Sequence, residues 1–322
     1  MNALLNVAGA VAGCAFALAA SAQDYPNRPV RIVTAYAPGG ASDIVARTIA
    51  QKLGEFWGRQ TLVENRPGAS GLVGTEYVKN AAPDGYTLQI GTTTTHVINP
   101  ITVPAAKFDP VRDFAPVTPI AIAPYLLAVH PSLKVRNTTE LIALAKSQPG
   151  KLNYASSGTS IYLGTELFKS MAGVDIVHIP YKGGGPALAA LLGNEVQLAF
   201  DPLPSAAFGH AKQGSLVLLA TSGARRPRAA PDLPTVAESG LPGFDVSSWY
   251  GVFAPAGTPQ PIIDRLAADI KRATELPDVQ AKLNELGSDG YNLSPDAFTK
   301  LVRRDQDMWM KLIRERNIKL DF

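Results

Sequence analysis

The chain has 322 residues, of which 46% are hydrophobic and 18% charged, and its formal net charge is +3. This composition excludes a disordered, collagen-like or coiled-coil protein, and at roughly 150 residues per domain the length predicts about two domains. Because the charges form no long block of one sign, neither a nucleic-acid partner nor a polybasic membrane contact is predicted.

The N-terminal residues 1–22 have the pattern of an export signal. They carry no charged side chain and run apolar up to a small-x-small site, Ala20-Ser21-Ala22. We predict a secretory signal peptide cleaved after Ala22. A transmembrane anchor is an alternative, but glycines interrupt the apolar run. A lipoprotein signal at Cys14, the only cysteine in the sequence, is a second alternative and would leave a very short apolar stretch before it.

Strands and helices alternate from residue 30 onward. Val30–Thr34 is a short β-rich run, followed by the loop Ala37–Gly40 and a helical pattern from Ser42 to Leu53. Turn residues at 83–85 lead into a strand at 86–90. This repeated order predicts an α/β protein with mainly parallel sheets and helices on both faces.

The pattern changes at 116–124, where prolines recur every few residues before a strand at 125–129. We predict that the chain crosses here from one lobe to another. After a helix that begins with the capping residues Asn137–Glu140, a second strand, loop and helix follow at 152–171. Strands at 196–200 and 216–221 complete this region.

Two amphipathic helices close the chain, each predicted to begin with a cap and a proline, at Thr258-Pro259 and Ser294-Pro295. The predicted organisation is a first part of lobe 1 at 23–124, lobe 2 at 125–222, and a return to lobe 1 at 223–322, with a strand near 247–254 assigned to the hinge.

Two strand-loop-helix units place glycine and hydroxyl residues directly before a helix. The first N–H groups of a helix lack partners and its dipole favours negative charge, so each loop could hold an anionic oxygen. Alternatively, Gly39, Gly40 and Gly158 only make tight turns, next to ordinary caps. The residues alone leave both interpretations open.

Familiar catalytic patterns are absent from the sequence: there is no G-x-S-x-G, H-E-x-x-H, C-x-x-C or G-x-x-x-x-G-K-[ST] motif. The four histidines have no ligand spacing, so neither a metal nor another cofactor is predicted.

A series of short motifs, in order along the chain, carries a family resemblance. They are Tyr25–Val30, Ala37–Asp43, Val63–Ala69, Asp84–Tyr86, Phe108–Pro110, Asp113–Val117, Tyr154–Thr159, Val177–Gly183 and Ala254–Pro259. From about residue 25 to the C-terminus, the chain resembles the Bug family, the extracytoplasmic solute-binding proteins of tripartite tricarboxylate transporters.

The resemblance implies a periplasmic protein of the type II Venus-flytrap fold, with two lobes, two crossovers and a ligand enclosed between them. It implies a monomer and not an enzyme, which captures a small carboxylate and delivers it to membrane transporter subunits. It also implies that the two helix-start loops hold the carboxylate and that Thr92, Thr93 and Asp201 line the cleft; Asp201 could instead be a cap or turn residue. The candidate ligand-binding residues are Tyr36, Pro38, Gly39, Gly40, Ala41, Ser42, Asp43, Thr92, Thr93, Ser156, Ser157, Gly158, Thr159, Ser160, Tyr162 and Asp201.

One departure from the family pattern concerns the ligand. The second helix continues with Ile161-Tyr162, where family members often carry histidine. Tyr36 and Tyr162 could offer aromatic faces, so an aliphatic dicarboxylate and an aromatic acid both stay open.

Two other functions also stay open. One is a secreted hydrolase using Ser42 or Ser157, although no histidine is near either serine in sequence. The other is a ligand-sensing subunit that docks on a signalling receptor.

Overall fold

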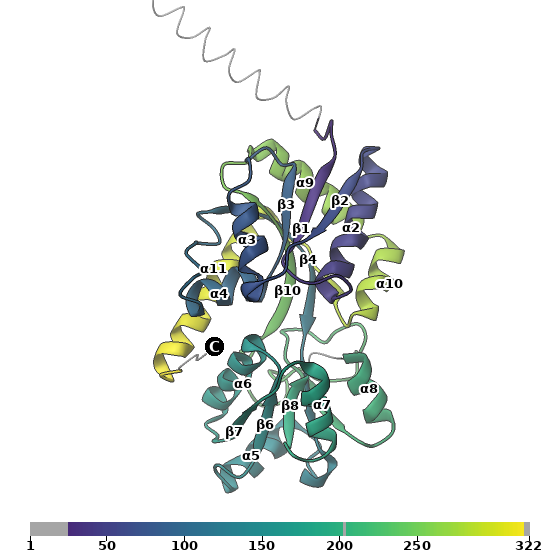
Figure 1. Ribbon diagram of the computed structural model, residues 1–322. Coiled ribbons are helices and arrows are strands. Elements are labelled where there is room, and N and C mark those ends of the chain that lie inside the picture. Colours follow the sequence, from purple (N-terminus) through teal and green to yellow (C-terminus); the bar gives the residue numbers. More distant parts are fainter. Residues whose placement is uncertain (1–24, 202–203, 319–322) are drawn as a thin grey trace, which may run out of the picture.

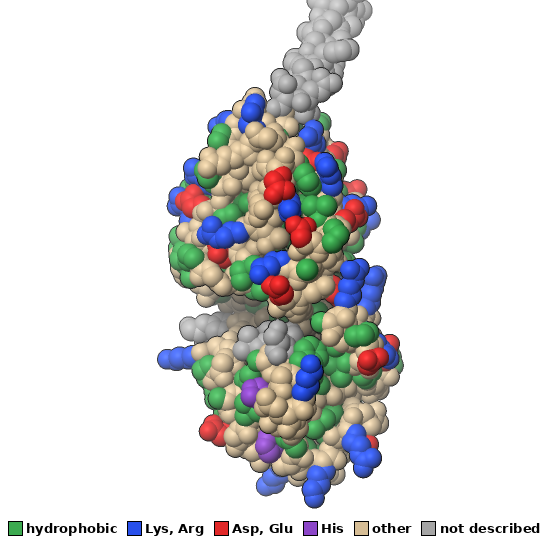
Figure 2. Space-filling model, turned by 90° about the vertical axis from the view of Figure 1, so that its right-hand side faces the viewer, with side chains coloured by type: hydrophobic (Ala, Val, Ile, Leu, Met, Phe, Trp, Pro, Cys, Tyr) green, Lys and Arg blue, Asp and Glu red, His purple; other side chains and the backbone are tan. Residues whose placement is uncertain are grey.

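The computed structural model describes residues 25–201 and 204–318, and it builds them into two bodies, one above the other in Figure 1. The predicted signal peptide, its cleavage site and Cys14 lie outside the described residues. In the described part of the chain, no helix is long and apolar enough to cross a lipid bilayer. Figure 2 shows that the surface narrows to a waist where the two bodies meet.

The upper body is built on a six-stranded sheet in the order β11-β4-β10-β3-β1-β2. Its strands are β1 (Val30–Thr34), β2 (Thr61–Asn65), β3 (Thr87–Thr92), β4 (Phe114–Pro124), β10 (Ser247–Pro255) and β11 (Asp289–Gly290). The lower body is built on a five-stranded sheet in the order β7-β6-β8-β5-β9. Its strands are β5 (Leu126–Val129), β6 (Asn153–Ser156), β7 (Val177–Pro180), β8 (Leu198–Asp201) and β9 (Val217–Thr221).

Helices cover both sheets (Figure 1). Those of the upper body are α2 (Ala41–Trp57), α3 (Leu72–Lys79), α4 (Asn99–Thr102), α9 (Gln260–Thr274), α10 (Pro277–Glu285) and α11 (Pro295–Glu315), with short turns η1 (Ala69–Gly71) and η2 (Thr94–Ile98). Those of the lower body are α5 (Thr138–Ser147), α6 (Thr159–Ala172), α7 (Gly184–Leu192) and α8 (Pro204–Lys212), with η3 (Pro131–Leu133).

The α/β class is confirmed, but the prediction of mostly parallel sheets needs correction. β1 lies parallel to β2 and β3, and β6 lies parallel to β7 and β8. β10 and β5 run antiparallel to their neighbours. The reason is that β4 leaves the upper sheet directly into β5, and β10 returns from the lower sheet after β9. A strand that enters a sheet from the opposite body runs against the strands that were built within it.

Each face of the upper sheet has its own apolar core, because successive strand side chains point to opposite faces. Ile32 packs with Ile49 and Leu266 in the core below α2 and α9. Val33, one residue along, belongs to a second core that includes Phe298 of α11 and extends into the lower body. The predicted pattern of helices on both faces is therefore confirmed.

The predicted caps have mixed outcomes. The Asn137 side chain accepts a hydrogen bond from the Glu140 amide at 2.8 Å, and Ser294 accepts one from the Ala297 amide at 3.2 Å. Both caps are confirmed. Thr258 was the wrong residue for the third cap: its hydroxyl donates to the Pro255 carbonyl, and the N-cap position of α9 is Pro259.

Candidate functional site

The loop before α2 ends in an N-terminus with no side-chain cap. Gly40 is the N-cap residue, with φ −76° and ψ 167°. It has no side chain that could accept a hydrogen bond from the first amides of the helix. Pro38, Gly39 and Gly40 are exposed and Ala41 is half-buried. The cap residue therefore gives the first-turn amides of α2 no side-chain acceptor, and amides of this kind can bind an anion.

Asp43 holds this loop in place. Its carboxylate accepts hydrogen bonds from the Gly39 amide (3.0 Å), Arg47 Nε (3.0 Å) and Asn65 Nδ2 (2.8 Å). Burial raises the pKa of Asp43, but these hydrogen bonds outweigh it, and the pKa falls to about 2. The carboxylate is therefore ionised at neutral pH, and its bonding partners are groups of the protein itself.

The start of α6 repeats the arrangement in the lower body. Gly158 is the N-cap residue, and it too provides no side-chain cap. Ser156 Oγ lies 2.7 Å from His178 Nε2, and Ser160 Oγ accepts a hydrogen bond from the Tyr125 hydroxyl at 3.1 Å. Gly158 is exposed, and Thr159 is half-buried. Backbone amides and hydroxyl groups therefore make up this helix start as well.

Three tyrosines, Tyr36, Tyr125 and Tyr250, belong to the surroundings of the two helix starts. Tyr36, in the first loop, lies 3.3 Å from Thr92 through their hydroxyl oxygens. Burial raises the pKa of Tyr125, hydrogen bonds to Ser160 and Ser248 lower it, and the neighbouring Tyr36 phenol raises it again. Burial, followed by the phenols of Tyr125 and Tyr36, raises the pKa of Tyr250 to about 12. The three phenols therefore act on one another electrostatically, and each is a neutral hydroxyl at neutral pH.

Two adjacent candidate residues, Thr92 and Thr93, point to different places. The Thr92 hydroxyl contacts Tyr36, whereas the Thr93 hydroxyl accepts a hydrogen bond from the Trp249 amide at 3.1 Å. Residues 92–95 are all threonines, and they also bond to one another: the Thr92 amide donates a hydrogen bond to Thr95 Oγ1 at 2.9 Å. The structure therefore groups Thr92, but not Thr93, with the first loop.

The remaining candidates occupy distinct environments. Ser42 is buried, and its Oγ lies 3.0 Å from Thr34 Oγ1. Ser157 borders a small space inside the lower body, beside Ala155 and Phe200. Tyr162 packs against His178, with ring centroids 4.5 Å apart. Asp201 ends β8, and its side chain lies outside what the structure describes.

The geometry bears on the hydrolase alternative. Ser42 bonds to a threonine, whereas the hydroxyl of Ser156, at the second helix start, contacts the imidazole of His178. The His178 ring lies against Tyr154, with centroids 5.0 Å apart, and against Tyr162. Within residues 25–201 and 204–318, the His178 ring donates no hydrogen bond to a carboxylate, so the third member of a triad is missing there. The same residues contain no cluster of three metal-ligating side chains.

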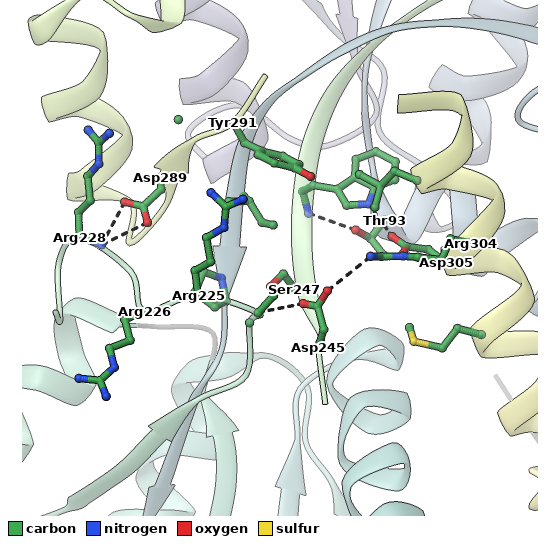
Figure 3. Close-up of a pocket in the computed structure, with 18 of the residues that line it drawn as sticks. Thr93, Arg225, Arg226, Arg228, Asp245, Ser247, Asp289, Tyr291, Arg304 and Asp305 are labelled. Carbon is green, nitrogen blue, oxygen red and sulfur yellow. Dashed lines mark hydrogen bonds and ion pairs between the residues drawn. The ribbon is translucent and has the colours of Figure 1, made fainter. Parts of the chain in front are cut away.

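Sequence reasoning missed several residues at this site. Tyr125, Ser248 and Tyr250 come from the two crossovers, and the two serines followed by two aromatic residues at 247–250 were the available signal. Sequence reasoning also missed a cavity of about 430 Å³ that lies between the upper sheet, α11 and the segment after β9 (Figure 3). Thr93 is the one predicted site residue that lines it.

Comparisons with known proteins converge on one group. The family model described as "Tripartite tricarboxylate transporter family receptor" (TctC) matches residues 45–318. Protein BugT of Bordetella pertussis is 34% identical over 324 residues, which cover 99% of both chains.

Two solved structures are similar in sequence and fold. "R. palustris Rpa4515 with adipate" is 37% identical, with a TM-score of 0.75, covering 92% of this chain and 99% of the other. MatC (Rpa3494) from Rhodopseudomonas palustris "with bound malate" is 32% identical, with a TM-score of 0.69, covering 90% of this chain and 100% of the other.

Proposed function

This chain belongs to the TctC family of tripartite tricarboxylate transporter receptors, as predicted from its motifs, and from that premise we propose that it captures an aliphatic dicarboxylate between its two bodies and delivers it to a membrane transporter. It is a binding protein of that family and not an enzyme. The dicarboxylate, its site and its delivery are the proposal.

The observation that carries the proposal is the pair of uncapped helix starts, one in each body, at Gly40 and Gly158. Each offers first-turn amides to an anion, and the helix dipole adds to the attraction. Tyr36 belongs to the first loop, Tyr125 bonds to Ser160 of α6, and the two phenols act on each other electrostatically. One carboxylate group held at this place would receive hydrogen bonds from both bodies.

The kind of donor suits a protein that must release its ligand. Amides, serine and threonine hydroxyls and the neutral tyrosine hydroxyls bind a carboxylate without a buried arginine ion pair, whose desolvation is costly. Closure of the two bodies over the ligand removes water and strengthens each hydrogen bond, so the closed form is populated mainly when the site is occupied. A transporter that docks on the closed form would then receive loaded protein.

The solved relatives support the choice of ligand class. Rpa4515 is described with adipate and MatC with malate, both aliphatic dicarboxylates, and both proteins align with at least 90% of this chain. We therefore favour an aliphatic dicarboxylate over an aromatic acid for this site. We further propose a monomer that acts in the periplasm, with lobe boundaries at the two crossovers, near residues 124–126 and 222–247.

Ligand-induced thermal stabilisation tests the proposal. Adipate, malate, succinate and benzoate are added in turn to the purified protein, and the melting temperature is measured. A ligand at 100 times its Kd stabilises the folded state by about 2.7 kcal/mol, which raises the melting temperature by roughly 5 °C or more. We expect this for at least one aliphatic dicarboxylate. If no dicarboxylate shifts the melting temperature, the proposed ligand class is wrong.

Delivery needs a separate measurement. Cells that contain the large and small membrane subunits are supplied with labelled dicarboxylate, with or without the purified protein in the periplasm. We expect uptake to depend on the binding protein and to be lost with the Gly158→Val variant. Ligand binding without any dependence of uptake would favour the alternative of a sensor subunit.

A further inference from the structure

The cavity of about 430 Å³ lies on the other side of β10 from the two helix starts. Successive side chains of a strand point to opposite faces. Ser247 and Trp249 line the cavity, whereas Ser248 and Tyr250 interact with Tyr125 on the opposite face. None of the residues of the loops 36–43 and 156–162 lines it. The cavity is therefore separate from the proposed dicarboxylate site.

The walls of the cavity combine aromatic surface with charge (Figure 3). The indole rings of Trp249 and Trp309 are almost fully buried, at 1% and 2% exposure, and they form the apolar part together with Leu301. Figure 3 shows Arg225 and Tyr291 on one side of the space, and Asp245, Arg304 and Asp305 on the other. A volume of this size is within the range of sites that bind small molecules.

Among the four arginines that line the cavity, Arg225 is the one whose side chain has no bonding partner in the described part of the chain; Arg228 donates to the neutral Gln280 side chain at 3.1 Å. Arg304 pairs with Asp305 at 2.8 Å and with Asp245 at 3.6 Å, and Arg226 pairs with Glu238 at 2.8 Å. Among the residues that the structure describes, Arg225 has neither an ion pair nor a side-chain hydrogen bond, and its charge acts on Tyr291. Its five N–H donors are free to bind an anion.

Two further polar groups at the cavity lack partners. The indole N–H of Trp309 is buried, and no acceptor among the described residues is within hydrogen-bond distance. The hydroxyl of Ser247 is in the same situation. A buried donor without a partner is destabilising, and an acceptor bound in the cavity would remove that cost.

The acidic side chains of the cavity limit what can bind there. Asp305 accepts from Trp249 Nε1 at 3.1 Å and from Arg304, Asp289 accepts from the Arg228 amide, and Asp245 accepts from the Ala224 amide. These carboxylates are already bonded to groups of the protein, and a second acid group on a ligand would have to lie beside them. Four arginines and three aspartates line the cavity, a difference of one positive charge, which suits a single anionic group.

We propose that this cavity is a second binding site, for a small aromatic monocarboxylate whose acid group pairs with Arg225 and whose ring lies against Trp249 and Trp309. The acceptor oxygens of the acid satisfy the free donors, and the flat ring fills the apolar part. The site differs in ligand charge from the proposed dicarboxylate site and does not depend on it.

Tryptophan fluorescence reports this binding directly, because two of the three tryptophans in the sequence line the cavity. The third, Trp57, donates to Asp269 in the upper body. Benzoate is titrated into the purified protein, with benzamide as a neutral probe of the same shape and adipate as a dianion. We expect benzoate to cause a saturable change in tryptophan fluorescence, and benzamide to bind at least about tenfold more weakly. In the Gly158→Val variant, we expect adipate to cause no saturable change in this fluorescence.

Two neighbouring arginines provide a matched pair of variants. Arg225→Gln removes the free guanidinium, and we expect benzoate to bind at least about tenfold more weakly. Arg226→Gln changes the net charge equally one residue along, and we expect less than about a twofold effect because Arg226 already pairs with Glu238. Arg225 is exposed, so its replacement leaves the core intact; the unchanged melting temperature of the free variant checks this.

Three results would overturn the proposal. The first is the absence of saturable benzoate binding to the wild-type protein. The second is equal weakening by Arg225→Gln and Arg226→Gln, which would indicate only the general charge of the surface. The third is loss of benzoate binding in Gly158→Val, which would locate benzoate at the helix starts. Dicarboxylate binding is measured separately, so its failure would count against the proposed function and not against this second site.

Discussion

The glycine at the start of α6 offers a test in which binding and folding can be separated. Gly158 has φ 169° and ψ 169°, an extended conformation that any residue adopts, and a Cβ added there meets no atom within 4 Å. Gly173, at the other end of the same helix, also has open space but a φ of +63°. A Cβ finds open space at either position, but only at Gly173 is the backbone strained.

The magnitudes follow from these two environments. Gly158→Val covers the first-turn amides of α6 and denies them to the carboxylate. Two hydrogen bonds to a charged group are worth about 3 kcal/mol or more, so we expect dicarboxylate affinity to fall at least about 100-fold. The free energy of unfolding changes by about 1 kcal/mol or less. Gly173→Val costs about 2 kcal/mol of stability, since a branched residue is forced into the left-handed region, and leaves affinity unchanged.

Calorimetric titration with the dicarboxylate and urea unfolding of the free protein measure the two quantities for both variants. Gly40→Val and Gly58→Val repeat the comparison on α2, where Gly58 has a φ of +59° and Gly40 does not need a glycine conformation. If Gly158→Val and Gly40→Val bind as the wild type does, the helix starts are not the site. If Gly173→Val loses affinity as well, the effect is a general one on α6.

Three further predictions concern the supporting structure. Because hydrogen bonds lower the pKa of Asp43 from 3.8 to about 2, its carboxylate contributes roughly 2 kcal/mol to the free energy of unfolding above pH 4, and this is lost between about pH 4 and pH 2. Urea unfolding of Asp43→Asn will show a free energy of unfolding that falls less steeply over this acid range. An unchanged pH dependence would contradict this. The Ser222 hydroxyl links the two crossovers, because it accepts a hydrogen bond from the Tyr125 amide at 2.8 Å and donates one to the Val246 carbonyl at 2.5 Å. Ser222→Ala is expected to lower the free energy of unfolding, measured with urea, by about 1–3 kcal/mol. An unchanged free energy of unfolding would refute the role of this link. Lys169 forms an ion pair with buried Glu166 at 2.6 Å. Lys169→Met leaves the Glu166 charge buried and unpaired, so we expect the free energy of unfolding to fall by about 3 kcal/mol and to recover in part when Glu166→Gln is added. No recovery in the double variant would exclude an unpaired buried charge as the cause.

Much of the fold could be predicted from local sequence. The alternation of β-rich runs with capped helices predicted the α/β class, and Asn137 and Ser294 began the helices expected of them. The sequence also predicted glycine-rich helix starts at Gly40 and Gly158, because an N-terminus after a short strand is a local feature. The direction of the strands was less accessible, since β10 runs antiparallel only because it returns from the other body.

The surroundings of the helix starts depend on contacts between distant segments. Tyr125 approaches Tyr36 and Ser160 only after the first crossover is folded. Thr92 and Thr93 are neighbours in sequence and equal in chemistry, but the end of β3 turns their hydroxyls toward different partners. The cavity behind β10 is assembled from β4, β10, β11, α11 and the segment after β9, and no local pattern contains that arrangement.

A crystal structure with adipate, or with the dicarboxylate that raises the melting temperature most, tests the central claim most directly. The account predicts one carboxylate group with its oxygens about 2.7–3.2 Å from first-turn amides of both α2 and α6, near the hydroxyls of Tyr36 and Tyr125. A dicarboxylate bound in the cavity beside Arg225, or bound to one helix start without the other, would contradict it.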